Sequence, residues 1–401
     1  NAGGRPAGGD AGGPTDNAAC PARTVQIAQP CTGDDEWHAV RESLQSGWLT
    51  QGPKVAALEK AFAARHGAAH GVAATSCTTA LHLILAALDV GPGDEVIVSA
   101  FTWVSTANVI LLCGATPVLV DVDRETFNPD PADVARRVTP RTKAIIAVHL
   151  FGRCADVDAI AAAAPGVAVV EDAACAAGAT YKGRPAGTLG AAAAFSFHPR
   201  KSITCGEGGM ILTNDGRLAE LCGSLRNHGA SVSEEQRHHG PRPYLLPDFD
   251  RLGFNYRMTD LQGAVALTQL GKLDGFLAER DRRARWYAEA LADIPWLRTP
   301  RMDADYGHAW QSYVTWVDPA TAPMPRNELM EALQARGVST RPGTHAVHML
   351  GLYRRRFGYA PDDYPAARDC DACTMAIPLH NRMSAADYEY VAAALHDVGG
   401  A

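Results

Sequence analysis

The sequence contains no long run of apolar residues. None of its apolar stretches approaches the roughly 18 residues that a membrane-spanning helix requires, so we do not expect an integral membrane protein. It has no excess of positive charge either, because 37 Lys and Arg residues stand against 44 Asp and Glu, for a formal net charge of -7. A broad basic surface for nucleic acid or for an anionic membrane is therefore not expected.

The sequence also lacks a dense framework of cysteines. Its ten cysteines are Cys20, Cys31, Cys77, Cys113, Cys154, Cys175, Cys205, Cys222, Cys370 and Cys373. They are scattered, and we interpret them as reduced thiols of a cytoplasmic protein. Cys370 and Cys373 form a single C-x-x-C, but two further zinc ligands are not present at a recognisable spacing. This favours packed thiols and no metal site.

What is present is an ordinary globular composition. The chain has 401 residues, of which 47% are hydrophobic and 20% charged, enough for two domains and a large core. Residues 1–23 are rich in Gly, Ala and Pro and are expected to form a flexible leader. We expect a large domain over 24–260, a linking helix over 261–296 and a small C-terminal domain over 297–401. The polar segment 231–242 is expected to be a mobile surface loop near the active site.

Strand-like and helix-like segments alternate along the large domain. Apolar runs of strand length lie at 95–100, 117–122, 144–150, 167–170, 191–197 and 210–213. Helical patterns lie at 55–64, 79–88, 105–113 and 156–164. Alternation of this kind, with strands apolar on both faces, predicts an α/β fold with a mainly parallel sheet between helices. The strand at 313–317 and the helices at 326–336 and 385–396 predict a smaller α+β domain at the C-terminus.

A lysine stands in a glycine-rich loop just after a predicted strand. Lys201 follows Phe197 by four residues, and the segment 195–209 is short of helix formers and dense in glycine. Such a loop can bring the backbone close to a ligand. The alternative, an exposed lysine in a glycine turn, is the more common situation for a lysine taken at random.

Further polar and aromatic residues stand where ligand contacts occur in α/β sheets. Asp172 comes just after the strand at 167–170, and it could pair with a charged ring nitrogen or cap a helix. Residues 76–79 place hydroxyls and free N–H groups before a helix, which suits a phosphate or simple capping. Trp103 follows the strand at 95–100 and could stack on a flat ligand or belong to the core.

Taken together, these groups match the needs of an enzyme that uses pyridoxal phosphate (PLP). Such an enzyme needs a lysine amine, a carboxylate for the pyridine nitrogen, donors for the phosphate and a flat surface against the ring. The joint appearance of these groups in this order along the chain is far more specific than any one of them.

The motifs around these residues carry a resemblance to a known family. They are Thr102-Trp-Val-Ser105, Glu171-Asp-Ala-Ala174, Phe195-Ser-Phe-His198, Gly206-Glu-Gly-Gly209 and Gly253-Phe-Asn-Tyr-Arg-Met258. From about Ser46 to Val391 the sequence resembles the DegT/DnrJ/StrS family of sugar aminotransferases, which are fold-type I PLP enzymes. The first and third motifs look closest to enzymes that aminate C4 of a UDP-sugar.

The resemblance implies roles for the residues that hold the cofactor. Lys201 matches the lysine that forms the Schiff base, and Asp172 matches the partner of the pyridine nitrogen. Ser196 and Thr78 match phosphate ligands, and Trp103 matches the aromatic residue that stacks on the ring.

Three more cofactor contacts follow from the resemblance. Thr79 is expected to add its backbone N–H to the phosphate. Asn255 matches an asparagine that reaches the phosphate in the neighbouring subunit, which implies a homodimer with shared active sites. Cys175 departs from the pattern, because the family usually has Gln or His there to contact the 3-hydroxyl of the cofactor, and a thiol is a weak donor.

Substrate contacts are expected from Thr50, His198, Arg257 and His348. Arg257 could bind a donor carboxylate or a sugar phosphate, or form a structural ion pair. His348 belongs to an H-x-x-H motif with His345, and the Pro-Gly pair just before it favours a loop and a role in substrate contact or packing.

The sequence thus predicts a cytoplasmic PLP-dependent aminotransferase. We expect it to move an amino group from an amino acid, glutamate or glutamine, to a keto group of a nucleotide-linked deoxysugar in amino-sugar or antibiotic biosynthesis. An aminotransferase for a keto-cyclitol or another small ketone is the alternative within enzymes. A non-catalytic PLP-binding regulatory protein is the alternative outside them, and residues 1–50 show no helix-turn-helix or basic cluster to favour it.

Overall fold

The computed structural model describes residues 23–231, 244 and 246–399. The leader predicted over 1–23 and the loop predicted over 231–242 therefore lie almost entirely outside the described residues. No helix within the described ranges is both long enough and apolar enough to cross a membrane.

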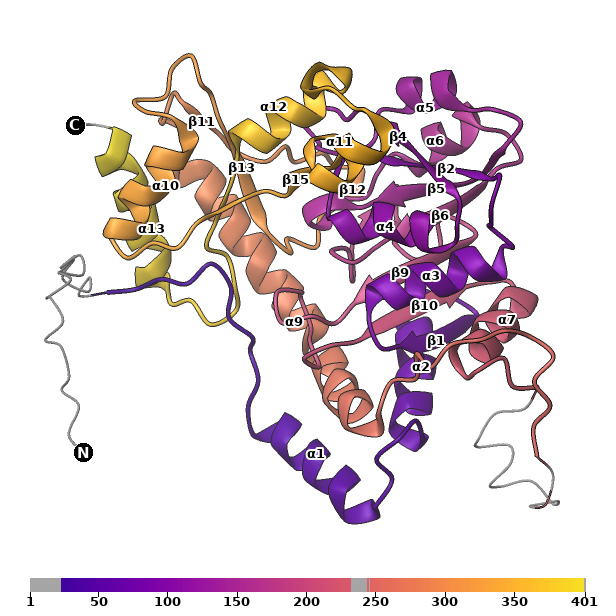
Figure 1. Ribbon diagram of the computed structural model, residues 1–401. Helices are drawn as coiled ribbons and strands as arrows, with labels where there is room; N and C mark the ends of the chain where they lie inside the picture. The colour runs from indigo at the N-terminus through magenta and orange to yellow at the C-terminus, as the bar shows by residue number, and fades with distance from the viewer. Residues whose placement is uncertain (1–22, 232–243, 245, 400–401) are drawn as a thin grey trace, which may run out of the picture.

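A sheet of seven strands forms the centre of the larger part of the protein (Figure 1). In spatial order its strands are β1 (His70–Ala74), β10 (Gly209–Thr213), β9 (Ala192–Ser196), β6 (Ala168–Asp172), β5 (Thr142–Val148), β2 (Glu95–Ser99) and β4 (Thr116–Val120). The strands from β9 to β4 are parallel, and β10 runs antiparallel to both of its neighbours. The predicted α/β fold with a mainly parallel sheet is confirmed.

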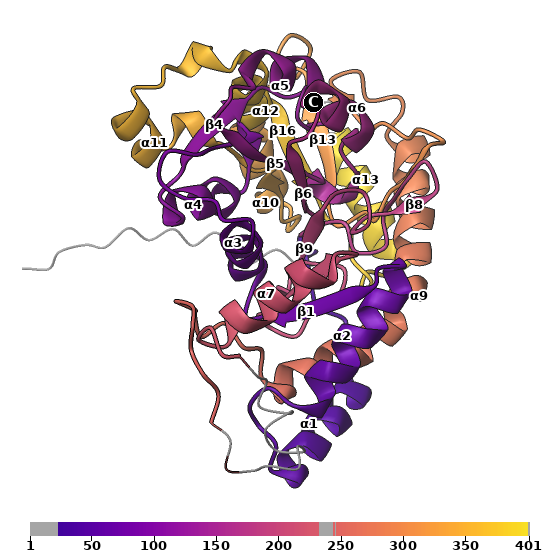
Figure 2. The ribbon, with the colours of Figure 1, turned by 90° about the vertical axis from the view of Figure 1, so that its right-hand side faces the viewer.

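Helices cover both faces of this sheet (Figures 1 and 2). They are α2 (Pro53–His66), α3 (Cys77–Ala87), α4 (Val104–Leu112), α5 (Pro131–Arg137), α6 (Val157–Ala163) and α7 (Gly216–Arg226). Successive residues of a strand point to opposite faces, so Val96 and Val98 join the core under α3, α4 and α7, whereas Ile97 joins the core under α5 and α6. This explains why the strands are continuously apolar.

A long helix, α9 (Asp260–Ala290), leads from the large sheet to the C-terminal part of the chain (Figure 1). Its first turn is closed by a capping box in which Thr259 and Gln262 exchange side-chain and backbone hydrogen bonds. The helices α1 (Asp34–Ser46) and α2 pack along it (Figure 2). The helix expected in this region is therefore present.

The C-terminal part is built around a second, smaller sheet. Its strands, in spatial order, are β11 (Leu297–Arg298), β13 (Tyr313–Val317), β16 (Thr374–Ile377) and β14 (Arg341–Pro342). Its helices are α10 (Arg326–Ala335), α11 (Gly351–Phe357), α12 (Pro365–Cys373) and α13 (Ala385–Gly399). Cys370 and Cys373 are buried in α12, where they pack as thiols.

Short strand pairs join the two parts. β7 (Thr180–Tyr181) lies between β8 (Arg184–Pro185) and β12 (Tyr306–Gly307), and β3 (Phe101–Thr102) pairs with β15 (His345–Ala346).

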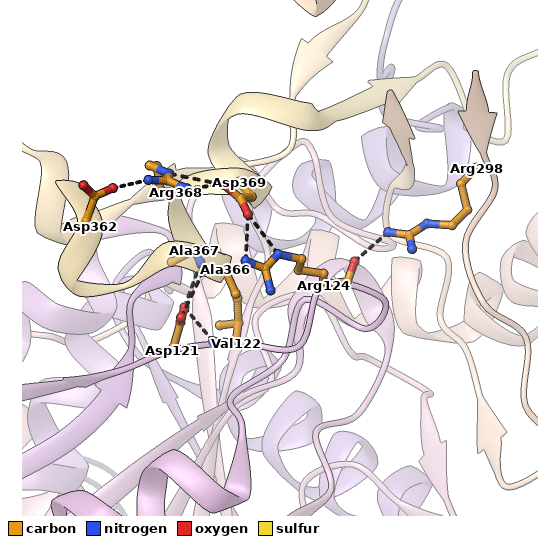
Figure 3. Close-up of polar contacts among 9 residues, drawn as sticks. All are labelled: Asp121, Val122, Arg124, Arg298, Asp362, Ala366, Ala367, Arg368 and Asp369. Carbon is orange, nitrogen blue, oxygen red and sulfur yellow. Dashed lines mark hydrogen bonds and ion pairs between the residues drawn. The ribbon is translucent and has the colours of Figure 1, made fainter. Parts of the chain in front are cut away.

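Polar contacts reinforce the junction at the start of α12 (Figure 3). The carboxylate of Asp121, one residue beyond β4, accepts hydrogen bonds from the N–H groups of Ala366 and Ala367 at 3.0 and 2.7 Å. Arg124 then pairs with Asp369 of the same helix, at 2.7 Å between nitrogen and oxygen. A carboxylate of the large sheet therefore caps a helix of the C-terminal part, which favours a fixed position for α12.

Candidate active site

A cavity of about 560 Å³ opens where the parallel strands β5, β6 and β9 end at their carboxyl termini. This is the edge at which ligands bind in α/β sheets. Of the residues expected in the site, those that line the cavity are Thr78, Trp103, Asp172, Cys175, Ser196, His198 and Lys201. The segments 311–312 and 341–344 of the C-terminal part complete its wall.

Lys201 lies in the loop that follows β9. The N–H of Lys201 donates to the carbonyl of His198 at 2.9 Å, and the N–H of Cys205 donates to the carbonyl of Phe197 at 3.0 Å. These two hydrogen bonds join the start and the end of the loop. The Lys201 amine donates to the sulfur of Cys175 at 3.1 Å. Burial lowers the pKa of this amine, but Cys175, Cys77 and Asp172 more than offset it, so its pKa is raised above the ordinary lysine value.

Asp172, the last residue of β6, is buried and held on both carboxylate oxygens. Thr106 donates to one oxygen at 2.7 Å, and the N–H of Ala174 donates to the other at 3.1 Å. No helix begins after Asp172, because the chain continues through turns to β7. The capping alternative is therefore not realised, and an oriented carboxylate faces the cavity.

Thr106 was missed by the sequence reasoning. It lies on the first turn of α4, after a different strand from Asp172, and its position in the sequence carries no signal of this contact.

The start of α3 presents polar groups to the same cavity. Ser76 and Thr79 form a capping box in which Ser76 Oγ accepts the N–H of Thr79 at 3.1 Å. The N–H that we expected Thr79 to offer to a phosphate is thus donated within the cap. Within the described part of the chain, the N–H groups of Cys77 and Thr78 have no protein acceptor. These are the orphan donors with which a helix N-terminus binds an anion.

A glycine brings the start of α3 close to Ser196. A Cβ on Gly209 would lie 2.4 Å from the carbonyl carbon of Ser76, so only glycine permits this approach of β10 to the helix. Gly209 is also the partner of Ser196 across the β10–β9 ladder. Ser196 and the first turn of α3 are therefore held next to each other.

Trp103 extends an exposed ring at the cavity. It precedes α4, lines the cavity and is 57% exposed, so the alternative of a core aromatic is not realised. Its ring centroid lies 5.6 Å from that of His345, which comes from the C-terminal part.

A buried pair behind the site fixes the end of β6. Glu171 accepts hydrogen bonds from the N–H groups of residues 187, 189 and 190 and from His149 Nε2 at 2.8 Å. His149 Nδ1 accepts the N–H of Ala155, which places the ring proton on Nε2. The backbone N–H of His149 donates to the carbonyl of Asp172 at 3.0 Å. This network, which the sequence reasoning also missed, supports the backbone that carries Asp172.

Several expected site residues lie outside the cavity of their own chain. His348 is buried, its Nε2 donates to the carbonyl of Pro361 at 3.1 Å and its ring packs on Tyr364, so a packing role replaces the expected substrate contact. Arg257 donates to Asn227 at 2.6 Å in place of facing the cavity.

Thr50 and Asn255 are exposed, and neither lines the cavity. Their contacts stay predictions, and that of Asn255 concerns the neighbouring subunit.

The residues of the cavity fit pyridoxal phosphate. Orphan N–H donors and hydroxyls at the start of α3 and the end of β9 suit its phosphate, and the oriented Asp172 suits its ring nitrogen. Lys201 supplies the amine, and the exposed ring of Trp103 supplies a flat surface. The fold and this donor set together define the class of fold-type I PLP enzymes.

Comparison with known proteins leads to the same class. Residues 30–396 match the model of the DegT/DnrJ/EryC1/StrS aminotransferase family. The chain is 42% identical over 372 residues to the spore coat polysaccharide biosynthesis protein SpsC of Bacillus subtilis, covering 92% of this chain and 95% of SpsC.

Solved structures agree. Helicobacter pylori PseC, an aminotransferase involved in the biosynthesis of pseudoaminic acid, is 25% identical with a TM-score of 0.87, over 94% of this chain and 99% of PseC. The PLP form of Spr1654 from Streptococcus pneumoniae is 27% identical with a TM-score of 0.87, over 94% of this chain and 99% of that one.

The chain belongs to the DegT/DnrJ/EryC1/StrS aminotransferase family. It is a PLP-dependent aminotransferase, as the sequence predicted, and the alternative of a non-catalytic regulatory protein is not supported.

Proposed function

We propose that this enzyme moves an amino group from an amino acid, glutamate or glutamine, to a keto group of a nucleotide-linked deoxysugar. The observation that carries this proposal is the cavity in which Lys201, Asp172, Thr78 and Ser196 converge. The similarity to SpsC over nearly the whole of both chains supports a sugar as acceptor, because SpsC is a protein of spore coat polysaccharide biosynthesis.

Lys201 is proposed as the residue that holds the cofactor and moves protons. Bound pyridoxal phosphate supplies a protonated ring that accepts the electron pair released at the substrate carbon. The Lys201 amine takes the proton from the α-carbon of the amino donor and returns a proton to the carbon that carried the keto group of the acceptor. The closed loop from residue 197 to 205 keeps the amine at one place in the cavity.

Asp172 is proposed as the partner of the pyridine nitrogen. A carboxylate at this nitrogen keeps it protonated. The hydrogen bonds from Thr106 and Ala174 fix the direction of the carboxylate before the cofactor binds. Ser196, Thr78 and the N–H groups at the start of α3 are proposed to bind the phosphate, and Trp103 is proposed to cover the ring.

The remaining proposals concern the oligomeric state, the substrate contacts and the cellular compartment. We propose a homodimer in which Asn255 reaches the cofactor phosphate of the neighbouring subunit and Thr50 contacts substrate. We also propose that the enzyme works in the cytoplasm, in amino-sugar or antibiotic biosynthesis. The nine described cysteines are all free thiols, as is usual for proteins of a reducing compartment.

A half-reaction screen tests the acceptor. The enzyme is first converted with glutamate to its pyridoxamine phosphate form, and keto-sugar nucleotides, keto-cyclitols and small ketones are then added one at a time. Return of the absorbance of the pyridoxal form identifies an acceptor. We expect return with a keto-sugar nucleotide; return with a keto-cyclitol alone would replace the sugar by the alternative substrate.

A further inference from the structure

A segment of the C-terminal part crosses to the large sheet and forms one wall of the cavity. We call residues 341–346 the crossing segment. It is fixed at one end by the pairing of β14 with β16 and at the other by the pairing of β15 with β3. The N–H of Ala346 also donates to Asp371 of α12 at 3.1 Å. A segment held in this way has a fixed position relative to the cavity.

A glycine lets the crossing segment pass close to its neighbours. A Cβ on Gly343 would lie 2.6 Å from Thr374 Oγ1 and 3.0 Å from Phe151 Cζ. The N–H of Gly343 donates to the same Thr374 hydroxyl at 3.2 Å. The residues on either side of Gly343 are therefore set firmly against the cavity, which they line.

Two polar groups of the crossing segment lack a complementary protein partner. Arg341 is exposed at the cavity and donates only to the carbonyl of Thr340, at 2.8 Å. In the part of the chain that the structure describes, no carboxylate lies within 4.0 Å of its guanidinium. Thr344 Oγ1 is buried and has no hydrogen-bond partner among the described residues. A buried hydroxyl without a partner is costly, so a ligand that accepts its hydrogen bond is favoured.

A second arginine lines the same cavity from the lysine loop. Arg200 precedes Lys201, and its carbonyl accepts a hydrogen bond from Gln311 at 2.8 Å. No carboxylate of the described ranges lies within 4.0 Å of the Arg200 side chain. His198 adds no positive charge near neutral pH, because burial lowers its pKa.

The charges that line the cavity leave a positive excess outside the cofactor site. The charged residues are Lys201, Arg200, Arg341, Asp172 and Glu207. With Lys201 and Asp172 committed to the cofactor, two arginines and one glutamate remain among the charged residues of the cavity wall. Such an excess favours an anionic ligand, and guanidinium groups bind carboxylate and phosphate oxygens through paired hydrogen bonds.

We propose that Arg341 and Arg200 bind an anionic group of the substrate and that the Thr344 hydroxyl donates to the same group. The proposal rests on the proposed function, in which the carboxylates of the amino donor and the diphosphate of the nucleotide both supply such oxygens. Arg257, expected from the sequence to do this, is held by Asn227 outside the cavity. The crossing segment thereby selects substrates that carry an acidic group.

Equilibrium binding to the holoenzyme tests the proposal without turnover. Glutarate, which is a dicarboxylate without an amino group, and UDP serve as the two probes in isothermal titration calorimetry. We expect Arg341→Gln and Arg200→Gln each to weaken at least one probe by roughly tenfold, in the range of a charge-assisted hydrogen bond. Arg341→Lys should recover part of the loss, because the charge stays while the paired geometry goes. Thr344→Val should weaken the same probe by a few-fold.

Arg336→Gln is the matched control. Arg336 is exposed in the same part of the protein and donates to a backbone carbonyl, as Arg341 does, but it does not line the cavity. It should bind both probes as the wild type does.

The outcomes separate the two sources of the anion. Weaker glutarate binding alone assigns the guanidiniums to the donor, weaker UDP binding alone assigns them to the nucleotide, and weakening of both assigns them to a shared site. Unchanged binding of both probes in both arginine variants, or no binding by the wild type, overturns the proposal. Arginine-dependent binding by an enzyme that aminates no keto-sugar would instead refute the sugar acceptor and leave the anion site standing.

Discussion

The Lys201 amine lies 3.1 Å from the sulfur of Cys175 and donates a hydrogen bond to it. The two residues come from different loops, one after β9 and one after β6, and both loops open on the same cavity. The family resemblance leads one to expect Gln or His in place of Cys175. The thiol therefore introduces an ionisable neighbour for the lysine where an amide or imidazole is usual.

This contact predicts a shift in the pH dependence of cofactor attachment. Cys175 raises the pKa of Lys201, and only the neutral amine can attack the cofactor, so attachment should accelerate as pH rises toward that pKa. Cys175→Ser removes the ionisable sulfur, lowers the pKa of Lys201 and should move the midpoint of the profile to lower pH. Stopped-flow reconstitution of the cofactor-free enzyme measures it. Cys113→Ser, at the end of α4 and away from the cavity, should leave the profile in place.

Lys201→Ala should abolish covalent attachment of the cofactor. The wild-type enzyme treated with borohydride should carry a stable label on Lys201, which peptide mass spectrometry locates. Lys182→Ala is the control, because Lys182 is exposed and paired with Asp158 on another surface. A stable label on a different lysine would remove Lys201 from its proposed role.

Asp172→Asn should keep the fold and lose most of the turnover, because an amide cannot hold a proton on the pyridine nitrogen. Thr106→Val, which removes a hydrogen bond at 2.7 Å to that carboxylate, should lower kcat by roughly tenfold, as expected for about 1.5 kcal/mol. Steady-state kinetics with circular dichroism as a check on folding measures both. A near wild-type rate for Asp172→Asn would leave Asp172 with a structural role only.

Asn255→Ala should weaken PLP binding by roughly 1–3 kcal/mol, the penalty for an unpaired phosphate oxygen, while Thr78 and Ser196 keep some affinity. Mixing this variant with Lys201→Ala locates the asparagine. If Asn255 acts across the interface, each mixed dimer has one site with both lesions and one intact site, and activity returns to about one site per dimer. The shared site would be refuted if activity did not recover after verified subunit exchange. It would also be refuted if light scattering showed a monomer and that monomer were fully active.

The buried His66 should make the fold less stable in acid. Its Nδ1 donates to the carbonyl of Phe62 at 2.9 Å, and its Nε2 accepts the N–H of Gly178 at 3.3 Å. Burial lowers the pKa of His66 from 6.5 to about 4, because a charged imidazolium ring would lose its hydration in the protein interior. Between pH 6.5 and 4 the unfolded chain therefore binds more protons at this position than the folded one, and stability falls as pH falls.

The size of this effect can be measured. From pH 8 to pH 5 the titration of His66 should cost about 2 kcal/mol. His66→Gln removes the titration, so its unfolding midpoint should fall less over that interval than that of the wild type. Thermal unfolding at both pH values gives the comparison, and His70→Gln, on β1, is the control. Equal pH dependence in the wild type and His66→Gln would show that the histidine does not titrate in this range.

Much of the fold could be predicted from local patterns in the sequence. The strands β2, β5, β6, β9 and β10 and the helices α2, α3, α4, α6 and α9 lie where the apolar patterns predict them. β1 escaped prediction because Val72 is its only β-branched residue, and its burial depends on pairing with β10. The placement of Lys201 and Asp172 just after strands was also predictable, because the ends of parallel strands meet at one edge of a sheet.

The sequence by itself determined the fold class, the cofactor and the residues expected to hold it, since local patterns and motifs carry that information. Only the tertiary structure decided which side chains meet. Thr106 and Asp172 are 66 positions apart in the chain, and Arg341 reaches the cavity only because its segment crosses from the small sheet to β3. By the same packing, His348 is buried against Tyr364 and not in the cavity. Contacts of this kind depend on strand order and on how the two sheets pack, and no local pattern encodes either.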